Sequence, residues 1–122
     1  MTRREQEIST YETTIGEMLR MAREHAKDCA PYAGKSVFEF YDYVRKLPYK
    51  DDPEGIEHMS RPRYTLSQSW EGPRDCDDKT LALAAYCELH KIPYRIVVCG
   101  ERETPHHVYP EIKLAYTQDW LI

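Results

Sequence analysis

The sequence lacks most of the patterns that would point directly to a function. Its four cysteines form no CxxC pair and no disulfide-scaffold spacing. The net charge is -4 without a cluster of basic residues, which argues against nucleic acid as a partner. There is no signal peptide and no apolar run long enough to cross a membrane. Phenylalanine is scarce as well, with two against ten tyrosines.

These absences favour a reduced, cytoplasmic protein that binds neither membranes nor nucleic acid. The tyrosine excess predicts a groove or core margin rich in amphipathic rings. A chain of 122 residues with 41% hydrophobic and 31% charged residues suits one globular domain. We expect a single domain made of an N-terminal helix (1–30), a helix with a long loop (31–73) and a cysteine-bearing helix with a sheet (74–122).

The first part of the chain predicts two amphipathic helices. Apolar residues recur at helical spacing over residues 8–27, and a turn is expected at 29–34. Ser36 and Glu39 have the spacing of a capping box, and Pro48 ends the helix that follows. The expected buried stripe of this second helix consists of Val37, Phe40, Tyr41, Val44 and Leu47.

Residues 49–73 show no sustained periodicity and contain three prolines and two glycines. A loop of this length is unusual in a small domain, so we expect short helical turns at 54–59 and 63–67. Trp70, near its end, has two interpretations. It could line a substrate groove, or it could cover the edge of the core.

The stretch that follows predicts a buried helix with a cysteine at its N-terminus. Asp75 is a good N-cap, and the residues from Leu81 to Leu89 are apolar almost all round. Cys76 therefore lies where the helix dipole favours a thiolate, although the neighbouring aspartates oppose it. The alternative is that Cys76 is simply a small buried residue.

Two strands are expected after the helix stop at Lys91-Ile92-Pro93. Residues 94–99 are β-branched and apolar, and residues 106–114 alternate. Val108, Ile112 and Leu114 share one face with His106, whereas His107, Tyr109 and Glu111 share the other. Pro110 marks an edge or a bulge. A turn at 115–119 and the start of another strand at 120–122 complete the chain.

A helix-terminal cysteine and a histidine at the start of a strand are the minimum for thiol catalysis. Helix packing on an antiparallel sheet can bring the two together, which indicates an α+β fold. Histidine would take the thiol proton and later protonate the leaving group.

The order of these motifs resembles the transglutaminase-like superfamily, and in particular its small phage and prophage-type members. The resemblance covers Ser36 to Ile122 and depends on Asp75-Cys76-Asp77-Asp78-Lys79, Ile92-Pro93, the strand at 94–99 and His107-Val108-Tyr109-Pro110-Glu111. It implies a papain-like α+β core without a cofactor or a metal, and a peptide or protein substrate. Cys76 would be the nucleophile and His107 the base of a cysteine hydrolase or acyl-transferase. Independently of the resemblance, Trp70 and Tyr109 are possible groove residues.

The chain departs from this family at two positions. Arg74 stands where the family has glycine before Asp-Cys, and the family's third acid lies a few residues beyond a tryptophan like Trp120, past the last residue given. We therefore expect a C-terminally incomplete site. Asp119 is a possible substitute, whereas Glu111 lies about 13 Å from His107 along an extended strand.

Two other functions remain open at this stage. Some members of the family have lost activity, so the domain could serve as a binding or assembly protein. A metal site built from Cys76, Cys87, Cys99, His106 and His107 is the other alternative, although structural zinc sites carry ligand pairs at short spacing, which this sequence lacks.

Overall fold

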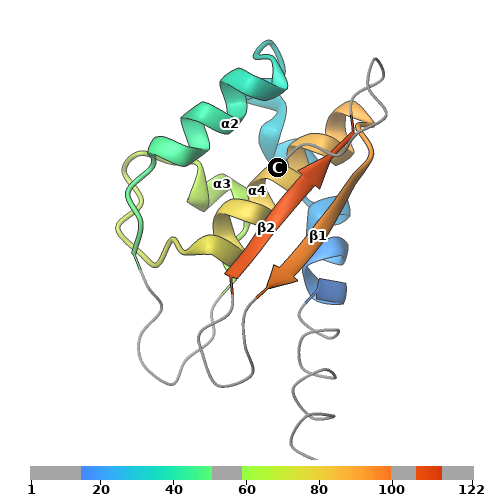
Figure 1. Ribbon diagram of the computed structural model, residues 1–122. Coiled ribbons are helices and arrows are strands. Elements are labelled where there is room, and N and C mark those ends of the chain that lie inside the picture. The colour runs from blue at the N-terminus through green and yellow to red at the C-terminus, as the bar shows by residue number, and fades with distance from the viewer. Residues whose placement is uncertain (1–14, 51–58, 100–106, 114–122) are drawn as a thin grey trace, which may run out of the picture.

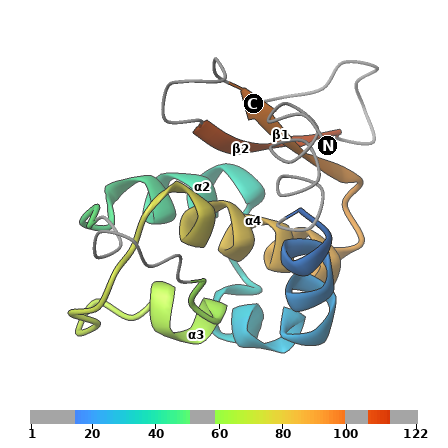
Figure 2. The same cartoon turned by 90° about the horizontal axis from the view of Figure 1, so that it is seen from below.

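The computed structural model describes residues 15–50, 59–99 and 107–113, and these residues have an α+β architecture (Figure 1). A layer of helices lies on one side of a two-stranded antiparallel sheet (Figure 2). In the described ranges we find no helix that could span a membrane. The elements are a helix at 15–24, the 3₁₀ helix η1 (Ala26–Tyr32), α2 (Val37–Lys46), α3 (Pro62–Thr65), α4 (Cys76–His90), β1 (Tyr94–Cys99) and β2 (His107–Ile112).

Helix α4 is the centre of the fold and contacts η1, α2, α3 and both strands. Ten of its fifteen residues are buried, because apolar side chains occupy every face. The helix ends where Lys91 takes a left-handed conformation with φ of 58°, and the N–H of Ile92 then donates to the carbonyl of Cys87 at 2.9 Å. Such a C-cap satisfies carbonyls that the helix leaves free. The buried helix and the stop that follows it, both expected from the sequence, are thus confirmed.

Helix α2 begins with the predicted capping box. The Ser36 side chain accepts from the N–H of Glu39, and the Glu39 side chain accepts from the N–H of Ser36. Phe40 is fully buried and stacks on Tyr86 of α4, with ring centroids 4.4 Å apart. Tyr41 was expected in the buried stripe, but 43% of it is exposed because it lies to the side of the α2–α4 contact.

β1 has the predicted bounds, whereas β2 covers only 107–112 of the stretch predicted at 106–114. Their register fixes which main-chain groups face outward. Lys113 donates to the carbonyl of Pro93 at 3.0 Å, and Ile96 lies opposite Pro110. Hydrogen-bonded and non-hydrogen-bonded pairs alternate in an antiparallel ladder, so Pro110 belongs to a non-hydrogen-bonded pair. Its nitrogen points to the free edge of β2, where the lack of an N–H costs nothing.

The first helix ends earlier than its periodicity predicts. The α-helix stops at residue 24 and is followed by η1, which contains Pro31 and replaces the expected turn at 29–34. Asp28 lies within η1, and its carboxylate accepts two hydrogen bonds from Arg61, at 2.7 and 2.9 Å, and one from the N–H of Arg63. This contact ties η1 to α3, which is the helical turn expected at 63–67. The other expected elements, at 54–58 and beyond residue 113, lie outside the described residues.

Candidate active site

Cys76 is the first residue of α4 and is half-buried. The preceding Asp75 caps the helix as predicted. Its carboxylate accepts from the N–H groups of Asp77 and Asp78 at 3.1 and 3.3 Å. In return, Asp78 accepts from the N–H of Asp75 at 3.1 Å, which completes a capping box. The backbone that presents the thiol is therefore fixed on both sides.

Asp78 also connects the site to a distant part of the chain. Its side chain is fully buried, and it accepts a hydrogen bond of 2.7 Å from the N–H of Ser60. The carboxylates that flank Cys76 thus have structural roles: one caps α4, and another tethers the end of the long loop. The sequence predicted only their favourable interaction with the helix dipole.

The first turn of α4 lies against the free edge of β2. The Thr80 hydroxyl donates to the Val108 carbonyl at 3.1 Å, and the main-chain N–H of Val108 lies close enough to the Cys76 sulfur to lower the pKa of the thiol. The thiol itself donates to Asp77, with 3.9 Å between Sγ and Oδ1. Both outward-facing polar groups of Val108 therefore face the first turn of α4. As a result, Cys76 lies beside the peptide unit that joins residues 107 and 108.

The environment of Cys76 both opposes and supports ionisation of the thiol. Burial raises the pKa of Cys76, and the carboxylates of Asp77 and Asp75 raise it further, whereas the N–H of Val108 lowers it. Burial raises the pKa of Cys29 and of Cys87 to about 12. Cys76 thus has the smallest increase of these three thiols. The net direction is upward, so the lowering expected from the helix dipole alone does not prevail.

The backbone of His107 begins β2 and pairs with Cys99. Val108 is 2% exposed and packs into the core, so its face of β2 is the one that meets the helices. The sequence pattern predicts the other face for His107. The side chains of His107 and Cys99, and the whole of His106, Asp119 and Trp120, lie outside what the structure describes.

The two residues expected at a groove have clear surroundings. Trp70 donates from Nε1 to the carbonyl of Pro73 at 3.1 Å, and its ring lies 5.3 Å from that of Tyr64. The ring also covers Gly72, where an added Cβ would approach it to 2.2 Å. Trp70 therefore packs within the α3–α4 loop. Tyr109 is half-buried on β2, opposite Val97.

Arg74, the residue before Asp75-Cys76, has a structural role that the sequence did not predict. It is 2% exposed, and its guanidinium donates to three main-chain carbonyls: Thr65 at 2.8 Å, Ser67 at 2.7 Å and Pro48 at 3.2 Å. Its own backbone pairs with that of Lys50, with both hydrogen bonds at 2.8 Å. Arg74 thus holds together the segments that lead into Cys76.

An apolar cavity of about 150 Å³ lies along the same face of α4 as the thiol. Cys76, Thr80, Leu83 and Cys87 follow one another at the spacing of a single helix face. In the sequence, the signal for this cavity is the pair of aromatic residues Phe38 and Tyr41, three positions apart on α2. Their side chains are 56% and 43% exposed. The cavity is lined by Val37, Phe38, Tyr41, Leu83, Cys87, Pro110 and Ile112.

Within the described ranges, no group of three or more histidine, cysteine or carboxylate side chains is placed to hold a metal ion. Comparison with known proteins gives no match to a protein-family model, to a curated protein or to a solved structure. The function is therefore inferred from the residues of the chain and their geometry.

Proposed function

We propose that this chain is a transglutaminase-like cysteine hydrolase or acyl-transferase that acts on amide bonds. Cys76 is the nucleophile and His107 the general base. The observation that carries the proposal is the contact between the first turn of α4 and the edge of β2. The Thr80 hydroxyl donates to the Val108 carbonyl at 3.1 Å and the Val108 N–H faces the Cys76 thiol, which brings the thiol next to the backbone of His107. A capped helix that presents its first residue to an antiparallel strand supports a papain-like core.

In the proposed reaction, the base removes the thiol proton and the thiolate attacks the carbonyl carbon of the substrate amide. The C–N bond then breaks, and the imidazolium returns its proton to the departing amine. The remaining thioester reacts with water, which gives a carboxylic acid, or with another amine, which gives a new amide. Either route restores the Cys76 thiol.

The apolar cavity supports a peptide substrate with an apolar side chain. Leu83 lies seven residues beyond Cys76 on α4, a rise of about 10 Å. An extended peptide covers that distance in about three residues. We infer that a substrate bound along β2 places an apolar side chain, about three residues from the reacting carbonyl, between α2 and β2.

A second candidate is a domain of the same fold that binds a partner without turnover. The observation that favours it is the raised pKa of Cys76, since burial and two carboxylates keep the thiol protonated. The two candidate functions predict different rates of alkylation at Cys76. A catalytic thiol reacts faster than expected for a half-buried cysteine, whereas the thiol of a binding domain does not.

Alkylation of the purified protein separates the two candidates. With limiting iodoacetamide at neutral pH, we expect labelling at Cys76 before Cys29 and Cys87, as measured by peptide mass spectrometry, and none at position 76 in Cys76→Ala. A peptidyl chloromethyl ketone with phenylalanine three residues from the reactive carbon should label Cys76 about tenfold faster than its alanine analogue, the effect expected for burying an aromatic side chain. The variant Phe38→Ala should reduce this preference.

Each part of the experiment can fail separately. First labelling of another cysteine would contradict the assignment of Cys76 as the nucleophile. Normal iodoacetamide labelling without preference between the two ketones would refute only the apolar cavity as a substrate site. A Cys76 that reacts no faster than the thiol of an unfolded control would favour the binding function.

A further inference from the structure

The outer edge of β1 presents main-chain groups without partners in the described part of the chain. The ladder alternates, and Val108 of β2 directs its N–H and carbonyl away from β1, toward α4. The residues opposite such outward-facing positions also face outward, on the other edge of the sheet. Tyr94, Ile96 and Val98 therefore direct their N–H and carbonyl groups away from β2. Natural proteins usually cover such an edge or use it to bind another strand.

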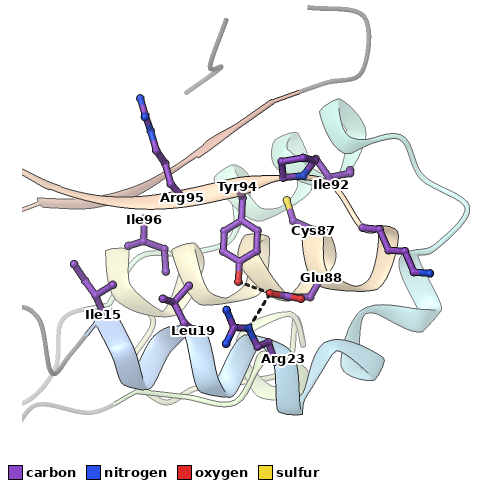
Figure 3. A pocket seen from close by; sticks show the side chains of 11 residues that line it. Ile15, Leu19, Arg23, Cys87, Glu88, Ile92, Tyr94, Arg95 and Ile96 are labelled. Carbon is purple, nitrogen blue, oxygen red and sulfur yellow. Dashed lines mark hydrogen bonds and ion pairs between the residues drawn. The ribbon is translucent and has the colours of Figure 1, made fainter. Parts of the chain in front are cut away.

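A groove of about 570 Å³ runs below this edge, between β1 and the helix at 15–24. Ile96 points down from β1 toward Ile15 and Leu19, which rise from the helix (Figure 3). Arg95 points to the opposite side of the strand, as alternation requires. One side of a strand added to β1 would therefore face an apolar floor.

The end of the groove near Tyr94 is polar and carries excess positive charge. Glu88 accepts a hydrogen bond of 2.7 Å from the Tyr94 hydroxyl, and Arg23 lies 3.5 Å from the same carboxylate oxygen (Figure 3). Arg23 is 69% exposed and Lys91 is exposed. This end of the groove therefore has two cations and one carboxylate, that of Glu88, which already accepts a hydrogen bond from Tyr94. An acidic side chain would be favoured at this end.

We propose that the free edge of β1 binds an extended peptide segment of a partner protein by strand addition. The segment runs antiparallel to β1. Its alternate apolar side chains lie over Ile96, Ile15 and Leu19, and acidic residues at its C-terminal end pair with Arg23 and Lys91. The edge of β1 lies on the other side of the sheet from the edge of β2, which faces Cys76 of α4. The proposal therefore does not depend on the thiol chemistry.

Fluorescence anisotropy with a labelled probe peptide, Val-Thr-Val-Thr-Val-Glu-Glu-amide, tests the proposal on the full chain. We expect saturable binding that is more than tenfold weaker when the amides facing β1 are N-methylated, because those N–H groups make the new ladder. Replacement of both glutamates by lysine should weaken binding about fivefold. Amide chemical shifts of Ile96 and Val98 should move on titration.

The protein variants provide matched controls. Arg23→Glu should weaken binding about fivefold, whereas Arg20→Glu makes the same charge change on the same helix, at a residue that pairs with Glu17 and Glu24, and should have little effect. Equal binding of the N-methylated peptide would overturn strand addition. Absence of saturable binding would overturn the proposal too. Dimerisation with shift changes at Ile96 and no peptide binding would instead assign the edge to a second copy.

Discussion

Arg74 has a structural role that its position next to Asp75 and Cys76 does not reveal. Its buried guanidinium donates to three main-chain carbonyls. Two of these, Thr65 and Ser67, belong to the segment that precedes the site, and Pro48 follows α2. A buried cation surrounded by carbonyl dipoles is costly to replace, since its removal leaves these acceptors unsatisfied.

Arg74→Met should therefore destabilise the fold by about 3 kcal/mol, a value typical of losing several hydrogen bonds to a buried charge. Urea unfolding followed by circular dichroism measures the change. Arg45→Met is the control, because Arg45 makes an exposed pair with Asp42 and should contribute less than about 1 kcal/mol. Equal losses in the two variants would contradict the structural role of Arg74.

The choice of base is also a question of single residues. The resemblance selects His107, which precedes Val-Tyr-x-Glu, whereas the sequence pattern groups His106 with Val108, and Val108 packs into the core. We predict that His107→Ala slows alkylation of Cys76 at neutral pH by about tenfold or more, because the thiolate loses its ion-pair partner. His106→Ala should leave the rate unchanged. The reverse result would identify His106 as the base.

Local features of the helices could be predicted from the sequence, whereas their tertiary contacts could not. The capping box of α2 and the N-cap of α4 depend on residues within one turn of the helix end. The contact between η1 and α3 depends instead on Asp28 reaching Arg61, thirty-three residues away. Likewise, Lys79 donates to the carbonyl of Leu47 at the C-terminus of α2, at 2.7 Å. No periodicity in the sequence records such contacts.

The candidate site follows the same division. The place of Cys76 at the N-terminus of α4 could be predicted from the sequence, because capping depends on residues within one turn of the helix end. Its role as the nucleophile stays a prediction. Its contact with Val108 required the register of the sheet, and the cavity required the placement of α2 over α4. Trp70 was open to two interpretations because nothing in the sequence shows that its ring lies on Gly72.

At the N-terminus of α4, the two roles of Asp75 can be separated by substitution. Asp75→Ala removes the cap and should cost about 1–2 kcal/mol in the free energy of unfolding. Asp75→Asn keeps a capping oxygen but removes a charge that raises the pKa of Cys76. In this variant the thiol should therefore ionise at lower pH, and its alkylation profile should shift in the same direction.

Ser36→Ala is the matched control for this element, since it removes an N-cap from α2 at a distance from the thiol. It should lower stability without moving the alkylation profile of Cys76. If Asp75→Asn destabilised the protein as much as Asp75→Ala, capping by the side-chain oxygen would not be the main role of this residue. Urea unfolding and the pH dependence of the iodoacetamide rate supply the two measurements.

Viewed as a whole, the described molecule uses the two edges of one small sheet differently. The first turn of α4 satisfies the edge of β2 and brings Cys76 to it, while the edge of β1 overlies an apolar groove. Helix α4 separates the two regions and contributes residues to both, with Cys76 at one end and Glu88 near the other. Stability of the buried α4 interface therefore determines the integrity of both proposed sites.

The buried thiols of Cys29 and Cys87 at this interface should make the free energy of unfolding depend on pH. Burial raises the pKa of Cys29 and of Cys87 to about 12 in the folded protein, above the ordinary value of about 9. The stability that these protonated thiols contribute is complete below about pH 9 and is lost as the pH rises toward 12, because the unfolded chain releases these protons first.

Each thiol should lower the free energy of unfolding by about 1.4 kcal/mol per pH unit in this window. Replacement of both by alanine should therefore flatten the slope measured by urea unfolding between pH 10 and 11 by roughly 3 kcal/mol per pH unit, whatever the absolute cost of the two cavities. An unchanged slope would show that these thiols are not protonated and buried as the structure places them.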